Sequence, residues 1–149
     1  MTAAQPIGRY RETILESFET KSCSRKRLWT GRILTGLSGA FFIFDASIKL
    51  LRVPAAVQGT IQVGYPESTI VGIGVVLLVC ALLYLIPRTS ILGAVLVTGY
   101  LGGAVATNVR AETGAFNILF PVIFGCIAWG GLWLRETRLQ KLLPLKHDA

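Results

Sequence analysis

The chain has 149 residues, of which 52% are hydrophobic and 15% are charged, and its mean hydropathy is +0.59. Soluble domains usually carry about 25% charged residues and disordered chains are poor in apolar ones, so this composition excludes disorder and disfavours a soluble domain. The net charge is +7, but the basic residues flank apolar segments rather than alternate with aromatic ones, which favours anionic lipid over nucleic acid as their partner.

The first 28 residues form a polar, basic tail without the pattern of a signal peptide. Within it, Tyr10, Ile14 and Phe18 recur at helical spacing with charged residues between them, which indicates a short amphipathic helix on the membrane surface. A frayed tail explains the same residues equally well. Residues 135–149 form a second basic tail at the other end of the chain.

Four apolar segments lie between the tails, at about 29–51, 68–86, 90–109 and 116–134. Each is near the roughly 20 residues that cross a hydrocarbon core of ~30 Å. Backbone polar groups in lipid must be satisfied within the segment, so these spans must be helices. The sequence therefore predicts an all-α fold, a bundle of four transmembrane helices over residues 29–134.

Turn-forming residues separate the predicted helices. Pro87 and the polar residues after it predict a tight turn between the second and third helices, while Pro54 and Gly64 mark a longer first loop. Inside that loop, Val57 and Ile61 are four residues apart, which indicates a short helix over one mouth of the bundle.

The distribution of basic residues predicts the orientation of the bundle. Twelve of the 15 lie in the two tails, at the start of the first helix or in the turn at Arg88, and these regions share one side of a four-helix bundle. Loops rich in Lys and Arg remain in the cytoplasm. We therefore expect a multi-pass protein with both termini in the cytoplasm.

Asp45 and Lys49 are the charged residues that most need an explanation, because both fall inside the first predicted span. They are four residues apart on one helix, so they share a face and can pair. A charge placed in lipid costs at least about 2.5–3.5 kcal/mol, so such residues face a cavity or pair inside the bundle. The pair is either part of a ligand site or proton relay, or an internal ion pair that fixes the packing of the helices.

Further polar residues fall at the same, outer end of the predicted bundle, in the first loop and in the third helix. Ordinary loop polarity explains some of them, but a single polar pocket that opens outward explains the whole set. The candidate residues of this ligand pocket or proton relay are Asp45, Lys49, Tyr65, Tyr100, Asn108 and Arg110.

Gly99 and Gly103 lie four residues apart on the third predicted helix. Small residues at this spacing let two helices approach closely, so we expect them at a contact between helices.

The sequence shows no self-sufficient catalytic or metal site. Its three cysteines and one histidine lack the spacing of metal ligands, and no serine or cysteine nucleophile has a histidine partner. We therefore expect no bound metal or covalent cofactor and do not expect an enzyme that acts alone.

Several stretches of the chain resemble the DoxX-like family of small four-helix membrane proteins. They lie at residues 44–50, 64–66, 83–89 and 96–107, and the resemblance extends over about 33–145. It implies a four-helix bundle in the bacterial inner membrane. Relatives often carry histidine where this chain has Asn108, and asparagine cannot carry a proton near neutral pH.

Two functions fit these observations, and the family resemblance is compatible with both. In the first, the chain is an accessory subunit of a membrane redox system whose pocket holds a quinone-like lipid, while a partner supplies the electrons. In the second, it is a non-catalytic structural or assembly factor, and its glycine-rich helix docks a membrane partner protein or a second copy of the chain. A transporter ranks last, because four helices without an internal repeat make a poor alternating-access machine.

Overall fold

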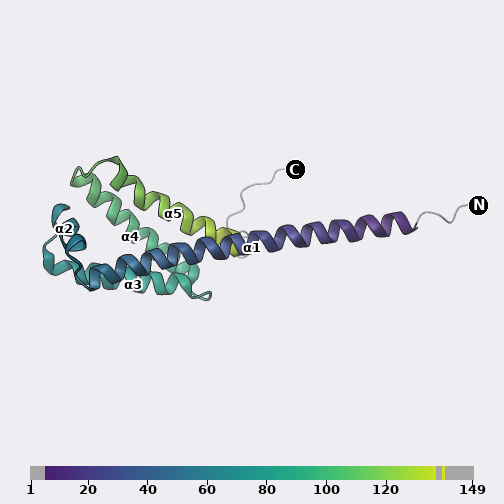
Figure 1. Cartoon of the computed structure of the whole chain (residues 1–149), viewed down its shortest axis with the longest axis horizontal. Helices are drawn as coiled ribbons and strands as arrows, with labels where there is room; N and C mark the ends of the chain where they lie inside the picture. The colour runs from purple at the N-terminus through teal and green to yellow at the C-terminus, as the bar shows by residue number, and fades with distance from the viewer. Residues whose placement is uncertain (1–5, 137–138, 140–149) are drawn as a thin grey trace, which may run out of the picture.

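The computed structural model of the chain describes residues 6–136 and 139, with side chains from residue 25 onward. It confirms the all-α prediction, since the described residues form helices and turns only (Figure 1). The elements are α1 (Pro6–Leu50), α2 (Pro54–Gln62), the short 3-10 helix η1 (Glu67–Thr69), α3 (Ile70–Leu85), α4 (Ser90–Arg110) and α5 (Ala115–Arg135).

Four helical segments are long and apolar enough to cross a membrane: Arg25–Leu50, Glu67–Leu85, Ser90–Arg110 and Ala115–Arg135. Seven of the eight ends lie within one residue of the predicted ends, which is the usual uncertainty of a helix end, and the eighth, Arg25, lies inside the continuous helix α1. Helix α2 corresponds to the short helix predicted in the first loop.

Helix α1 has no break where the polar tail meets the first span. It begins at Pro6 and continues through residue 29 to Leu50, so that the helical part of the tail extends straight out from the bundle (Figure 1). The side chains of residues 1–24 lie outside the described part, as do residues 137–138 and 140–149. An amphipathic surface role for the tail therefore stays a prediction.

The four spanning helices form a ring in which each packs against two others. Helix α1 contacts α3 and α5, and α4 contacts the same two helices, so that α1 and α4 lie on a diagonal. Figure 1 shows α4 and α5 leaning away from α1 and α3 toward the end of the bundle that carries α2. The arrangement is thus closed at the end near the termini and opens toward α2.

Glycines hold the closed end together. A Cβ atom on Gly93 of α4 would lie 2.1 Å from the backbone nitrogen of Tyr84, and one on Gly31 of α1 would lie 2.9 Å from the carbonyl oxygen of Gly131. No side chain fits at such distances, so the helix backbones are in direct contact here. These contacts fix α4 against α3 and α5 against α1.

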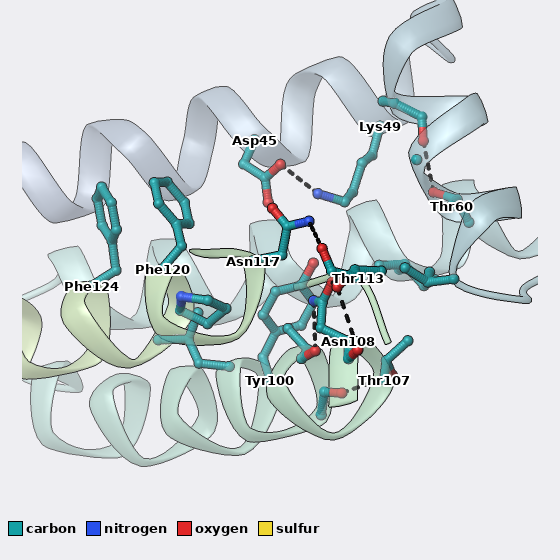
Figure 2. A pocket seen from close by; sticks show the side chains of 18 of the residues that line it. Asp45, Lys49, Thr60, Tyr100, Thr107, Asn108, Thr113, Asn117, Phe120 and Phe124 are labelled. Carbon is teal, nitrogen blue, oxygen red and sulfur yellow. Dashed lines mark hydrogen bonds and ion pairs between the residues drawn. The ribbon is translucent and has the colours of Figure 1, made fainter. Parts of the chain in front are cut away.

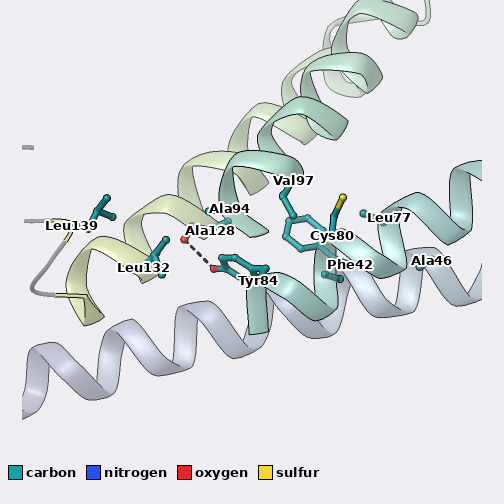
Figure 3. Packing of buried hydrophobic residues seen from close by; sticks show 11 residues of the cluster. Phe42, Ala46, Leu77, Cys80, Tyr84, Ala94, Val97, Ala128, Leu132 and Leu139 are labelled. Carbon is teal, nitrogen blue, oxygen red and sulfur yellow. Dashed lines mark hydrogen bonds between the residues drawn. The ribbon is translucent and has the colours of Figure 1, made fainter. Parts of the chain in front are cut away.

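The buried core lies next to these contacts (Figure 3). Its largest fully buried apolar and aromatic side chains are Tyr84, Phe42, Leu77, Leu132 and Val97. The Tyr84 hydroxyl donates a hydrogen bond of 2.9 Å to the carbonyl oxygen of Ala128. This bond satisfies a polar atom that would otherwise be costly to bury.

The structure brings neither Gly99 nor Gly103 into a contact between the described helices, so a packing role for these two glycines stays a prediction. A Cβ atom on either residue would have no other atom within 4 Å among the described residues. The small-residue spacing alone did not identify which face of α4 turns inward. The close approach uses Gly93 instead, one and a half to three turns earlier.

Candidate functional site

A cavity of about 620 Å³ occupies the open end of the bundle, where α1, α4 and α5 diverge beneath α2 (Figure 2). Small-molecule sites in proteins are typically of roughly 300–1,000 Å³. The cavity follows from the fold: the glycine contacts bring the helices together at one end, and α4 and α5 lean away from α1 and α3 toward the other.

Asp45 and Lys49 both line this cavity. They come from successive turns of α1, and the Lys49 ammonium donates to the Asp45 carboxylate in an ion pair. The Asp45 side chain is 26% exposed and the Lys49 side chain is 17% exposed, so neither is sealed in the core. Their predicted pairing is confirmed, and two of the three ammonium protons and the second carboxylate oxygen are left for another partner.

Tyr100 of α4 also lines the cavity (Figure 2). Among the described residues, its hydroxyl has no hydrogen-bond partner. The Tyr84 hydroxyl, by contrast, is fully engaged in the core. The Tyr100 hydroxyl is therefore a free donor and acceptor at the wall of the cavity.

Asn108 lines the cavity as predicted, but its amide is engaged locally. Its Nδ2 donates to the carbonyl oxygen of Ala104 at 2.9 Å, and its Oδ1 accepts from the Thr113 hydroxyl at 2.7 Å. Thr113 lies in the turn between α4 and α5. The contacts indicate that Asn108 holds this turn against α4, and one Nδ2 proton remains for a ligand.

Arg110 and Tyr65 connect α4 to the segment after α2. The Arg110 guanidinium donates to the carbonyl oxygen of Val63 at 3.0 Å, and its carbon lies 5.9 Å from the centre of the Tyr65 ring. The Tyr65 hydroxyl lies 3.3 Å from the Thr107 hydroxyl. Tyr65 lines the cavity, whereas Arg110 lies behind this wall and braces it.

The opposite part of the cavity wall is aromatic and was not predicted. Phe41 of α1 stacks on Phe124 of α5 with ring centres 3.9 Å apart, and Phe120 lies 4.8 Å from Phe124. All three line the cavity, with Phe120 and Phe124 facing α1 in Figure 2. In the sequence such residues look the same as lipid-facing ones, because any apolar side chain is allowed on either face of a span.

Asn117 and Pro121 of α5 carried a signal that sequence analysis missed. A polar residue one turn before a proline, inside an apolar span, indicates a helix face turned to a cavity, because proline leaves a carbonyl oxygen without its helical donor. Both residues line the cavity. The Asn117 Nδ2 donates to the carbonyl oxygen of Thr113, and its Oδ1 remains available.

The cavity thus has two chemically different ends. Its aromatic end accepts a flat or chain-like apolar group. Its polar end offers donors from Lys49 and Tyr100 and acceptors from Asp45 and Asn117. Such a combination suits an amphipathic molecule with an oxygen-bearing head.

The sequence profile of the DoxX-like family matches residues 33–131, about two thirds of the chain. No curated protein and no solved structure matches the chain significantly. The matched range includes the part of α1 from residue 33 to its end, all of α2, α3 and α4, and the part of α5 that lines the cavity. The chain, a membrane protein with four spanning helices, therefore belongs to the DoxX-like family.

Proposed function

We propose that this protein is the ligand-binding accessory component of a membrane redox system and that its cavity holds a quinone-like lipid. The observation that carries the proposal is the cavity with one aromatic and one polar end, in which the Tyr100 hydroxyl has no partner among the described residues. A quinone ring has two carbonyl oxygens that accept hydrogen bonds, an apolar face and, in membranes, an apolar chain.

The polar end supports this assignment through its proton-bearing groups. Reduction of a quinone to a hydroquinone takes up two electrons and two protons. In this proposal a partner protein supplies the electrons, while Lys49 and Tyr100 donate hydrogen bonds to the ring oxygens and Asp45 holds the Lys49 ammonium in place. Asn108 donates a further hydrogen bond through the Nδ2 proton that Ala104 leaves free.

The location of the cavity supports an outward-facing site. Helix α2 and the turn between α4 and α5 lie at the opposite end of the bundle from the termini. With both termini in the cytoplasm, as the basic tails predict, the cavity opens toward the outer face of a bacterial inner membrane.

A second proposal, an assembly factor for a membrane partner, rests on a different observation. Gly99 and Gly102 of α4 do not line the cavity and have open space beside them among the described residues. In this view a partner helix or a second copy of the chain packs there, and the Asp45–Lys49 pair only fixes the fold.

A pair of tyrosine variants tests the first proposal. In lipid nanodiscs, Tyr100→Phe is expected to lower the affinity for ubiquinone with two isoprene units about tenfold, the effect of one lost hydrogen bond. Its thermal stability should remain that of the wild type, because the hydroxyl has no partner among the described residues. Equilibrium titration and thermal unfolding measure the two quantities.

Tyr84→Phe is the matched control. It removes the buried bond to Ala128, so we expect a loss of about 1 kcal/mol of stability and an unchanged affinity. A wild type that does not bind the quinone, or a Tyr100→Phe variant with unchanged affinity, would overturn the proposal.

A further inference from the structure

The segment of residues 53–66 between α1 and α3 covers the polar end of the cavity. It consists of α2 and the turn after it, and Ala56, Gly59, Thr60 and Val63 contribute to the cavity wall. Thr60 is the only buried residue of α2. Little apolar surface therefore holds this segment in place, and segments with few buried contacts are those that open locally.

Each end of the segment is a turn that contains a residue in the left-handed conformation. Arg52, just before it, has a φ of 52°, and Gly64, near its end, has a φ of 88°. A left-handed conformation costs a residue with a side chain roughly 1–2 kcal/mol. The Arg52 guanidinium pairs with the Glu67 carboxylate at 2.6 Å, and this exposed ion pair joins the two ends of the segment.

The free edge of the segment is fastened to α4 through exposed polar contacts. They are the Arg110 bond to the Val63 carbonyl oxygen, the Arg110 guanidinium over the Tyr65 ring, and the Tyr65–Thr107 hydroxyl contact. Each is exposed, and exposed contacts of this kind are individually weak. They can break without disturbing the packed end of the bundle.

We propose that residues 53–63 form a hinged cap and that Arg110, held by Tyr65 and Thr107, is the latch that keeps it closed through the Val63 carbonyl oxygen. Opening turns the cap about Arg52 and Gly64, breaks the bond to Val63 and gives the polar end of the cavity access to the aqueous side. Arg110 is then a positioning residue that acts through the cap, rather than a contact of the ligand. The assignment of a ligand to the cavity rests on the proposed function, but the motion of the cap does not.

Hydrogen–deuterium exchange of the full chain in nanodiscs tests the latch without any ligand. In Arg110→Gln, the amides of residues 55–63 should exchange about tenfold faster than in the wild type, while those of 93–105 remain unchanged. Arg88→Gln is the matched control, because it removes an exposed arginine at the far end of the bundle. Unchanged exchange of the cap in Arg110→Gln would overturn the proposal.

Gly64→Ala provides an independent variant. Its Cβ atom would lie 3.1 Å from the Arg110 Nη2 atom, at a backbone angle that alanine rarely adopts. We expect this variant to increase exchange in the cap as Arg110→Gln does. A cap that remains as protected as in the wild type would contradict the role of the latch.

Binding kinetics separate the latch from the proposed ligand. With two-isoprene ubiquinone as the probe, Arg110→Gln should raise the association and dissociation rates together, each about tenfold, and leave Kd within about twofold. A faster dissociation alone would make Arg110 a ligand contact and overturn the latch. If the wild type does not bind the probe, the proposed function fails and the exchange experiment still decides the cap.

Discussion

Replacement of Gly93 by alanine is expected to destabilise the protein by about 3 kcal/mol or more, the upper end of the cost of overpacking. The added Cβ atom would lie 2.1 Å from the nitrogen and 2.4 Å from the Cα atom of Tyr84. Both are backbone atoms, so no side-chain rotation relieves the clash. The first turn of α4 must move away from the end of α3, and the buried Tyr84 side chain must move with it.

Thermal unfolding in detergent or nanodiscs measures this effect, together with the yield of monodisperse protein. Gly99→Ala is the matched control on the same helix, because its Cβ atom has open space among the described residues. We expect a change within about 1 kcal/mol there, the difference in helix propensity between the two residues. A stable Gly93→Ala variant would contradict the packing of α3 on α4. A strongly destabilised Gly99→Ala variant would favour a partner helix on that face.

The same glycines show which parts of the fold could be predicted from the sequence. The four spans follow from the length of each apolar segment and from the need to satisfy backbone groups in lipid, so their prediction was close. The glycine contacts depend on how each helix is rotated about its axis. The glycine spacing alone gives no signal of that rotation, and it pointed to Gly99 and Gly103 rather than to Gly93.

The sequence predicted those residues of the site that place a charge or a polar group inside or beside a span, and it did not predict the others. Asp45 and Lys49 stand out because ionised groups are rare inside spans, and topology alone brought Tyr65, Tyr100 and Asn108 to the same end. The role of Arg110 depends on one carbonyl oxygen in a loop 47 residues away, which only the three-dimensional structure shows.

The three aromatic residues Phe41, Phe120 and Phe124 were missed for a related reason. A phenylalanine side chain is equally suited to face lipid or to line a cavity. Which of the two it does here depends on where α1 and α5 diverge, and the sequence does not show that. The sequence signal that does exist is indirect, since Asn117 and Pro121 mark the face of α5 on which Phe120 and Phe124 recur.

Asp45→Asn is expected to lower the affinity for two-isoprene ubiquinone at least about tenfold and to destabilise the protein by about 1–2 kcal/mol. The variant leaves the Lys49 ammonium without its counter-charge beside the cavity. Loss of one partner of a buried pair costs about 3–5 kcal/mol, and a cavity that admits water reduces that cost. Equilibrium titration and thermal unfolding measure the two effects on the same preparations.

A charge-swapped variant, Asp45→Lys with Lys49→Asp, separates a ligand role of the pair from a structural one. The swap keeps two opposite charges four residues apart on α1, so it should restore most of the stability that Asp45→Asn loses. It also moves the ammonium roughly 6 Å along the helix, away from the position at which it would meet a ligand oxygen. We therefore expect the swapped protein to be stable and its affinity to stay low. If the swap restores both stability and affinity, the pair only specifies the fold. That result would contradict a role of the pair in binding a quinone and would favour the assembly factor.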